Sequence, residues 1–154
     1  MAVPKSIHAA KGLWRGKSKL NQSWLPPGKR VSESNSSLHI DTDSLDTFAT
    51  ITYDWHYEGK REEGTIILAK QGKSNAVEIG WVDSWHEHDG VLHLKGEDSG
   101  TGSVKARGLW SAGKEVWGWT IELLATADSL TVKMENVPPA GEPIWAVEGV
   151  YSRD

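Results

Sequence analysis

The sequence predicts an all-β fold, an antiparallel up-and-down β-barrel of about ten strands. Apolar and polar residues alternate in segments of about eight to eleven residues, the pattern of strands that bury one face. Short polar, Gly or Pro connections separate these segments, and none is long enough for a helical crossover, which favours antiparallel pairing of consecutive strands. Because so many strands in one sheet tend to close on themselves, we expect a calyx-shaped barrel without free edges.

The expected strands follow one another without a linker, a low-complexity tract or an internal repeat. We therefore expect residues 1–154 to form a single domain, which is long enough to build its core without disulfides or a structural metal. The strands are expected at approximately residues 11–20, 29–40, 47–57, 61–70, 76–87, 91–97, 103–110, 115–125, 129–136 and 144–153.

The first expected strand lies in the most basic part of the chain. The first thirty residues contain Lys and Arg but no acid, although the whole chain has a net charge of −4. Arg15, Lys17 and Lys19 occupy alternate positions, as on a strand with one solvated face. Binding of single-stranded nucleic acid, with Trp14 and Trp24 as stacking platforms, is the alternative. The sequence argues against a nucleic-acid partner, because Trp14 is expected to be buried.

The second expected strand has no apolar face over much of its length. Ser32, Ser34, Asn35, Ser36 and Ser37 make both faces polar, which weakens the register. This pattern indicates either a solvated edge or a polar stripe in an otherwise apolar cavity.

The loop before that strand, Trp24-Leu25-Pro26-Pro27-Gly28, is stiffened by two prolines. Its Trp and Leu side chains are exposed unless they fold over something. The loop therefore either caps the barrel mouth or forms a homodimer contact.

Two turns predict the pairing of the central strands. Glu58-Gly59-Lys60 closes a hairpin whose inward face carries Ala49, Ile51, Tyr53, Trp55, Gly64, Ile66 and Leu68. Asp89-Gly90 is expected as a two-residue type I′ turn, because Asp and Gly tolerate positive φ. That turn would place His86 opposite His93 and would put Trp85 and Leu94 on one face.

The last four strands complete an aromatic interior. Strands 103–110 and 129–136 lie beside two strands with inward aromatic residues. The inward positions of those two strands are Trp117, Trp119, Ile121, Leu123, Trp145, Val147, Gly149 and Tyr151.

The composition excludes several classes of site. The chain has no Cys, which excludes disulfide frameworks, thiolate metal sites and cysteine nucleophiles and makes a reducing compartment the simpler interpretation. Neither a secretory leader nor an apolar run of about 20 residues is present, so we expect a soluble cytoplasmic protein with no membrane span. Nine Trp in one chain indicate a thick core or an aromatic-lined cavity.

Gly12-Leu13-Trp14 on the first strand, with Arg153 on the last, resembles the calycin signature, in which a Trp packs beneath a basic residue near the C-terminus. Ten strands without a lid helix resemble fatty-acid-binding-protein-like and nitrobindin-like barrels more than eight-stranded lipocalins. Leu13-Trp14-Arg15-Gly16 and Trp81-Val82-Asp83-Ser84 are similar to segments of an uncharacterised, mostly bacterial group of calycin-like domains.

The resemblance implies a barrel that encloses a small apolar or amphipathic molecule. Nitrobindin-like barrels hold haem through a His on a strand near the C-terminus, whereas this chain has no His after His93. We therefore expect no haem and no other cofactor.

The inward positions define the expected ligand-binding residues. Small-molecule sites are concave and mostly apolar, with a few polar groups that orient the ligand. The candidates are Tyr53, Trp55, Trp81, Asp83, Trp85, Trp117, Trp119, Met134 and Trp145.

Asp83 is the one candidate for a catalytic residue. It takes an inward position among Trp residues, where burial would favour a protonated carboxyl that donates a proton or orients a ligand. The alternative is a structural carboxylate that accepts Trp N–H bonds or pairs with an inward Arg.

Three histidines, His86, His88 and His93, lie close together in the expected hairpin and are weak candidates for a metal site. Since Trp85 and Leu94 take the interior positions, this cluster should face solvent, and we expect a surface polar patch without a functional metal.

The leading hypothesis is non-covalent binding of a small apolar or amphipathic ligand in the barrel. A second hypothesis is an enzyme that uses Asp83 as general acid or base inside the barrel. A third is a barrel filled by its own Trp side chains that acts through protein contacts. The sequence does not name the ligand.

Overall fold

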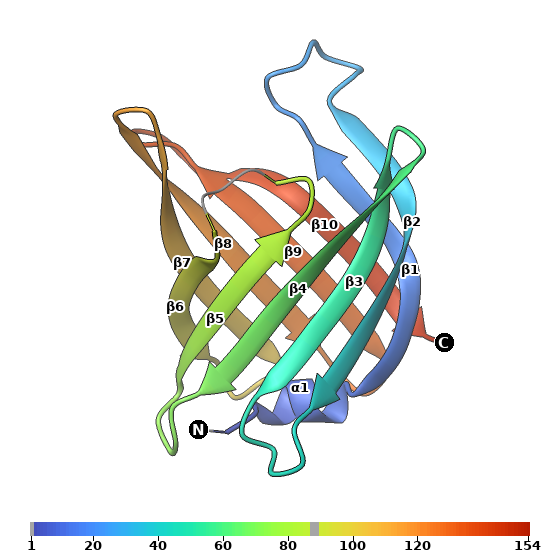
Figure 1. The fold of residues 1–154 in the computed structure, drawn as a ribbon, viewed down its shortest axis with the longest axis vertical. Helices are drawn as coiled ribbons and strands as arrows, with labels where there is room; N and C mark the ends of the chain where they lie inside the picture. The colour runs from blue at the N-terminus through green and yellow to red at the C-terminus, as the bar shows by residue number, and fades with distance from the viewer. Residues whose placement is uncertain (1, 87–89) are drawn as a thin grey trace.

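The computed structural model describes residues 2–86 and 90–154 and shows a closed barrel of ten antiparallel strands (Figure 1). Consecutive strands are neighbours around the barrel, and β1 pairs with β10 to close it. The all-β up-and-down barrel expected from the alternating pattern is confirmed. The elements are α1 (Lys5–Ala9), β1 (Gly12–Asn21), β2 (Val31–Thr42), β3 (Ala49–Tyr57), β4 (Lys60–Lys70), β5 (Ala76–Asp83), β6 (Leu92–Asp98), β7 (Ser103–Ala112), β8 (Glu115–Ala125), β9 (Ser129–Val137) and β10 (Ile144–Arg153).

The short helix α1 is an addition that the sequence did not predict. Figure 1 shows it across the lower end of the barrel, opposite the loops that join β1 to β2 and β3 to β4. Ile7 is fully buried in the core, and an isolated bridge between Ala2 and Lys70 holds the preceding residues against β4. One end of the barrel is thus closed by the chain itself. Among the described residues, no helix is long and apolar enough to cross a membrane.

Trp14 and Arg153 close the seam between the first and last strands. They lie opposite each other in the β1–β10 ladder, and the Arg153 guanidinium lies 4.3 Å from the centroid of the Trp14 ring. The Trp14 Nε1–H donates to the Ala10 carbonyl oxygen at 2.8 Å, so a buried indole loses no hydrogen bond. The expected packing of this Trp beneath a basic residue is confirmed.

The hairpin at Glu58 and Gly59 forms as predicted. Both residues have positive φ, 50° and 79°, as a type I′ turn requires. Tyr57 pairs with Lys60, and the register carries Ile51 opposite Ile66 on the buried face.

The register predicted for the strands on either side of Asp89-Gly90 is wrong. Strand β5 ends at Asp83 rather than at residue 87, and His93 lies opposite Gly80 instead of His86. The shift is an even number of residues, so each strand keeps the face that the alternation assigned to it. Residues 84–86 after β5 and residues 90–91 before β6 belong to no strand, and Glu87, His88 and Asp89 of the predicted hairpin lie outside the described residues.

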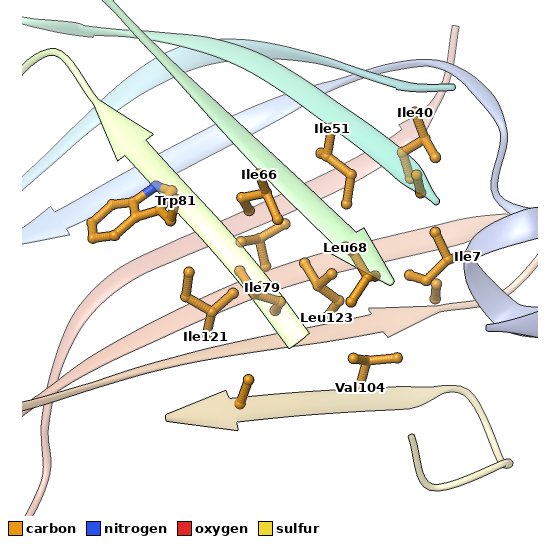
Figure 2. Packing of buried hydrophobic residues seen from close by; sticks show 14 of the residues in the cluster. Ile7, Ile40, Ile51, Ile66, Leu68, Ile79, Trp81, Val104, Ile121 and Leu123 are labelled. Atoms are coloured by element: carbon orange, nitrogen blue, oxygen red, sulfur yellow. The ribbon is translucent and has the colours of Figure 1, made fainter. Parts of the chain in front are cut away.

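Aliphatic side chains fill the lower part of the barrel. Figure 2 shows Ile7 from α1 at one end of this cluster and Trp81 from β5 at the other. Residues such as Ile51, Ile66 and Leu68 are fully buried between them. The lower lumen is therefore packed by the side chains of the described residues.

Candidate functional site

A pocket of about 410 Å³ lies at the upper end of the barrel. Its walls come from the ends of β1, β5, β6, β7, β8, β9 and β10 and from the loops after β1 and β5. We call it the mouth pocket. Its lining residues are Leu20, Asn21, Ser23, Trp24, Trp81, Trp85, His86, Leu92, Trp110, Trp119, Asn136, Ile144, Trp145 and Ala146.

Tryptophan dominates this lining. Trp81 and Trp119 form the packed part of the wall: their rings are stacked with centroids 5.1 Å apart and planes 10° apart, and both side chains are buried. Trp24 and Trp145 are 67% and 39% exposed and stand at the rim. The pocket therefore has a rigid aromatic wall and an accessible aromatic rim.

Trp145 reaches the rim because of a β-bulge. The register of β10 against β9 shifts between Trp145 and Val147, so Trp145 pairs with Glu135 and Val147 pairs with Met134. Simple alternation placed Trp145 and Val147 on the same inner face, and the bulge corrects this: Ala146 is buried while Trp145 is partly exposed. The Asn21 side chain donates to the Trp145 carbonyl oxygen at 2.8 Å and holds this strand against β1.

His86 is placed differently from the prediction. Instead of facing solvent beside His93, its ring contacts Trp55, Trp81, Trp85 and Trp119, with ring centroids 4.9–5.9 Å apart. His93 is exposed on β6, so the expected surface cluster of the two rings does not form. His88 lies outside the described residues, and among those described no three His, Cys, Asp or Glu residues group in a way that could hold a metal ion.

Asp83 explains why His86 enters the barrel. One carboxylate oxygen accepts the backbone N–H groups of Trp85 at 2.9 Å and His86 at 3.2 Å, which ends the β5 ladder and turns the loop inward. The other oxygen accepts the Tyr53 hydroxyl at 2.7 Å and the Trp55 Nε1–H at 3.3 Å. Of the two interpretations open from the sequence, this geometry favours the structural carboxylate.

Tyr53 connects this carboxylate to the aromatic wall. Its hydroxyl accepts the Trp81 Nε1–H at 2.9 Å while it donates to Asp83. Burial raises the pKa of Tyr53 well above that of an ordinary tyrosine, and the negative charge of Asp83 raises the pKa further. Tyr53 is therefore a neutral hydroxyl that fixes the position of the Trp81 ring.

A second, much smaller pocket of about 20 Å³ lies deeper in the lumen. We call it the inner pocket; about one water molecule fills that volume. His86 lines both pockets and stands between them. The inner pocket is lined by Ser18, Leu20, Leu38, Tyr53, Trp55, Ile66, Asp83, His86, Val132, Met134, Val147 and Tyr151.

The nine residues proposed from the sequence thus divide into three groups. Trp81, Trp85, Trp119 and Trp145 line the mouth pocket, and Tyr53, Trp55, Asp83 and Met134 line the inner pocket. The remaining residue, Trp117, lines neither pocket and stacks on Trp110 with ring centroids 5.6 Å apart.

Several lining residues of the mouth pocket are not among the nine predicted from the sequence. Trp110 was not selected, although it lies opposite Trp117 in the β7–β8 ladder and contributes a ring to the mouth pocket. Its Nε1–H donates to the Asn136 side chain at 3.2 Å, so Asn136 is held as a polar group in the wall. Trp24 was expected either to cap the mouth or to form a dimer contact, and it lies at the pocket rim. Alternation could have revealed both Trp110 and Asn136. Trp110 shares the inward parity of Val104 and Ala106, and Asn136 shares that of Val132 and Met134.

The fold is similar to that of a solved crystal structure, Rv2717c from M. tuberculosis. The TM-score between the two structures is 0.67 over 100% of this chain and 99% of that chain, at 12% sequence identity. This similarity of fold is consistent with the calycin-like barrel expected from the sequence. No protein-family profile and no curated protein matches the sequence.

Proposed function

We propose that the protein binds a small apolar or amphipathic molecule non-covalently in the mouth pocket. The observation that carries this proposal is the convergence of six Trp side chains from six parts of the chain on one space of about 410 Å³. Pockets for small ligands have volumes of about 300–1,000 Å³ and mostly apolar walls with a few polar groups. Here Asn21, Asn136 and His86 are the polar groups that would orient the ligand.

The packing of the barrel supports the same proposal. The lower lumen is filled by aliphatic side chains and closed by α1, whereas the upper end keeps its aromatic surface open to solvent. Exposed Trp is unfavourable in water unless something covers it. A ligand in the mouth pocket would cover Trp24 and Trp145, the two most exposed indoles of its wall.

We also infer membership in the calycin superfamily. The stack of Arg153 on Trp14 and the closed ten-stranded meander support this inference. A role for Asp83 as general acid or base gains no support, because both of its oxygens already accept hydrogen bonds from protein donors.

The test is a fluorescence titration with 1-aminoanthracene, a neutral flat probe, in which energy transfer from Trp reports binding. Truncation of Trp145 or Trp24 to Ala removes rim surface without opening the buried core, since both side chains are exposed. We expect each truncation to weaken binding about tenfold, equivalent to about 1.4 kcal/mol.

The matched control is Leu109→Ala, which truncates an exposed apolar side chain of β7 outside the pocket lining and should leave the affinity unchanged. Equal affinity in the wild-type protein, W145A and W24A would reject the mouth pocket as the binding site. Absence of any binding by the wild-type protein would reject the proposed function.

A further inference from the structure

The barrel wall is incompletely hydrogen-bonded between β2 and β3. The ladder between these strands runs from Thr42 opposite Ala49 to Ser37 opposite Asp54 and stops there. Above this point β2 continues to Val31 and β3 to Tyr57, each paired only with its other neighbour. We call this part of the wall, residues 31–36 facing 55–57, the seam.

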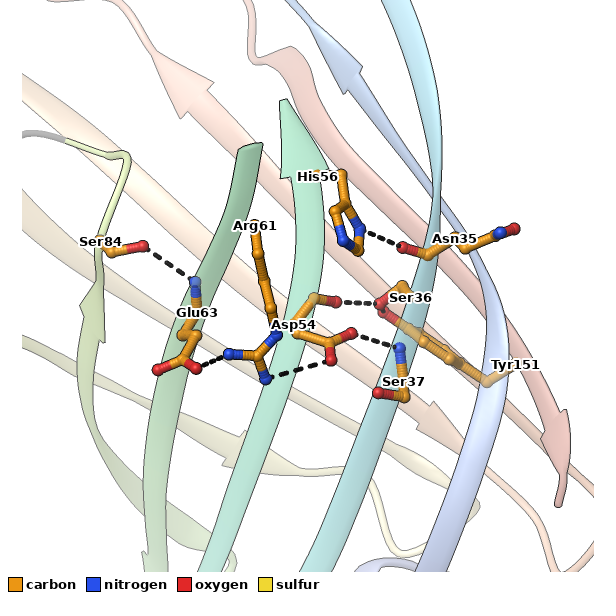
Figure 3. Close-up of polar contacts among 9 residues, drawn as sticks. All are labelled: Asn35, Ser36, Ser37, Asp54, His56, Arg61, Glu63, Ser84 and Tyr151. Carbon is orange, nitrogen blue, oxygen red and sulfur yellow. Dashed lines mark hydrogen bonds and ion pairs between the residues drawn. The ribbon is translucent and has the colours of Figure 1, made fainter. Parts of the chain in front are cut away.

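Side chains replace the backbone ladder in the seam (Figure 3). The backbone N–H of His56 donates to the Ser34 hydroxyl at 3.0 Å instead of to a carbonyl of β2. The His56 ring lies 3.4 Å from the Asn35 carbonyl oxygen, through its Nδ1 atom. Each of these bonds holds the wall through a rotatable side chain, so it opens more easily than a continuous ladder.

The lower end of the seam is also held by side chains. The Ser36 hydroxyl donates to the Asp54 carbonyl oxygen at 2.6 Å, and the Asp54 carboxylate accepts the Ser37 backbone N–H at 2.9 Å. Ser36 also pairs with the Tyr151 hydroxyl at 2.8 Å, across Gly16 of the intervening strand β1. The serine-rich stretch was expected as either a solvated edge or a polar stripe in the cavity, and it combines both. Ser32 and Asn35 are exposed, whereas Ser36 is buried and bonds the Tyr151 hydroxyl.

The inner pocket lies behind the lower end of the seam. Its lining includes Trp55 of the seam, Leu38 just below the seam on β2, and Tyr151, which bonds Ser36. Its present volume of about 20 Å³ is too small for a hydrocarbon chain. Separation of the two strands would enlarge the inner pocket and join it to the mouth pocket past His86, which lines both.

We propose that the seam between β2 and β3 opens to admit the tail of an elongated amphipathic ligand into the inner pocket. The inference rests on the proposed function, because it takes the mouth pocket as the site of the ligand's other end. The ligand class follows from the geometry: a flat or polar end among the Trp, Asn21 and Asn136 side chains, and an apolar tail toward Met134 and Val132.

The decisive experiment closes the seam by a cross-link. The chain has no Cys, so Asn35→Cys with His56→Cys gives a single pair of thiols on the two sides of the seam. They are joined by a disulfide, or by a short bis-maleimide where the sulfur atoms do not meet. Two probes are compared: 1-aminoanthracene, which fits the mouth pocket alone, and 11-(dansylamino)undecanoic acid, which carries a long tail.

The cross-linked protein should bind 1-aminoanthracene with unchanged affinity and take up the long probe at least tenfold more slowly. Reduction of the disulfide should restore the rate. Equal rates of uptake of the long probe by the closed and the open form would overturn the seam proposal and leave the mouth pocket standing. Failure of both probes to bind the uncross-linked protein would overturn the proposed function itself.

A second variant tests the seam in the opposite direction. Ser34→Ala removes the acceptor of the His56 N–H and should accelerate uptake of the long probe about two- to tenfold, the effect of one lost hydrogen bond on an opening equilibrium. Ser32→Ala, on the same strand outside these contacts, is the matched control and should change nothing. Hydrogen exchange gives a readout without any ligand: the His56 amide should exchange faster in S34A than in S32A, and equal exchange would contradict the proposal.

Discussion

Arg153 joins three separate parts of the lower barrel end, and its truncation gives the sharpest stability prediction. Its guanidinium stacks on Trp14 and donates to the carbonyl oxygens of Ala9 at 2.8 Å, of Lys11, and of Ala127 at 3.0 Å. These carbonyls belong to α1, to the turn before β1 and to the turn before β9. One side chain therefore fixes the helix, the first strand and the β8–β9 hairpin together.

The magnitude follows from these contacts. An exposed cation–π contact contributes about 0.5–1 kcal/mol. Three hydrogen bonds from a charged donor contribute about 1.5–3 kcal/mol each when buried, and much less when solvent competes, as it does for exposed Arg153. We therefore expect Arg153→Ala to lower the free energy of unfolding by about 2–4 kcal/mol. For a chain of this size that corresponds to a fall in Tm of about 5–15 °C.

Thermal unfolding followed by circular dichroism measures this change. Arg153→Lys keeps the charge but not the planar fork, so it should recover less than half of the loss. Arg107→Ala, at an exposed position on β7, is the control and should change Tm by no more than about 2 °C. A loss of less than 1 kcal/mol in R153A would refute the view that this side chain holds the lower end together.

Three further predictions concern hydrogen-bonded side chains. Asp83→Asn should destabilise the protein by about 1–3 kcal/mol in urea unfolding, because an amide cannot accept on both of its terminal atoms; unchanged stability would contradict the role assigned to Asp83. The raised pKa of Tyr53 means that the folded state disfavours its phenolate. The neutral Tyr53 hydroxyl therefore contributes its full share to the stability of the fold below the pKa of about 10 of an unfolded tyrosine, and this contribution is lost as pH rises through the pKa of Tyr53 in the folded barrel. Absorbance of tyrosinate near 295 nm should therefore grow at Tyr53 only as the barrel unfolds, and Tyr53→Phe should remove that part of the signal; a Tyr53 phenolate in the folded barrel near pH 10 would contradict this. The Phe48 backbone N–H, with further donors from Thr47 and Leu45, lowers the pKa of Asp43 to about 2. The Asp43 carboxylate therefore stabilises the folded state above a pH of about 4, and this stabilisation is lost as pH falls toward 2. Asp43→Asn should flatten the acid limb of the stability curve between these values, and an unaltered limb would show that the turn does not depend on this carboxylate.

The strand alternation was sufficient to predict the barrel, but not where strands end. The face of Tyr53 and Ile66 could be predicted because Glu58 and Gly59 form a tight turn that permits one register. The same reasoning failed at Asp89-Gly90, because the carboxylate of Asp83 captures the N–H groups of Trp85 and His86 and ends β5 early. This contact is a local Asx turn, but the continued alternation of Trp81, Asp83 and Trp85 indicated a strand through it.

Two other differences have equally specific causes. Helix α1 has five residues, too few to show a helical period, and is held by the burial of Ile7 rather than by helix propensity. The bulge at Ala146 places one extra residue in β10, which alternation cannot anticipate. The candidate site was partly predictable because most inward Trp side chains at the upper end meet in one pocket. Trp110 shares this inward parity, whereas His86 joins the site only through the geometry of the loop after β5.

The central claim is that the Trp-lined mouth pocket holds a small molecule. Native mass spectrometry of gently purified protein, beside the mass of the denatured chain, tests it most directly. The account predicts a stoichiometric additional mass in the wild-type protein that is reduced in W145A and retained in L109A. A native mass equal to the chain mass, together with no change in Trp fluorescence on addition of 1-aminoanthracene or a fatty acid, would contradict it.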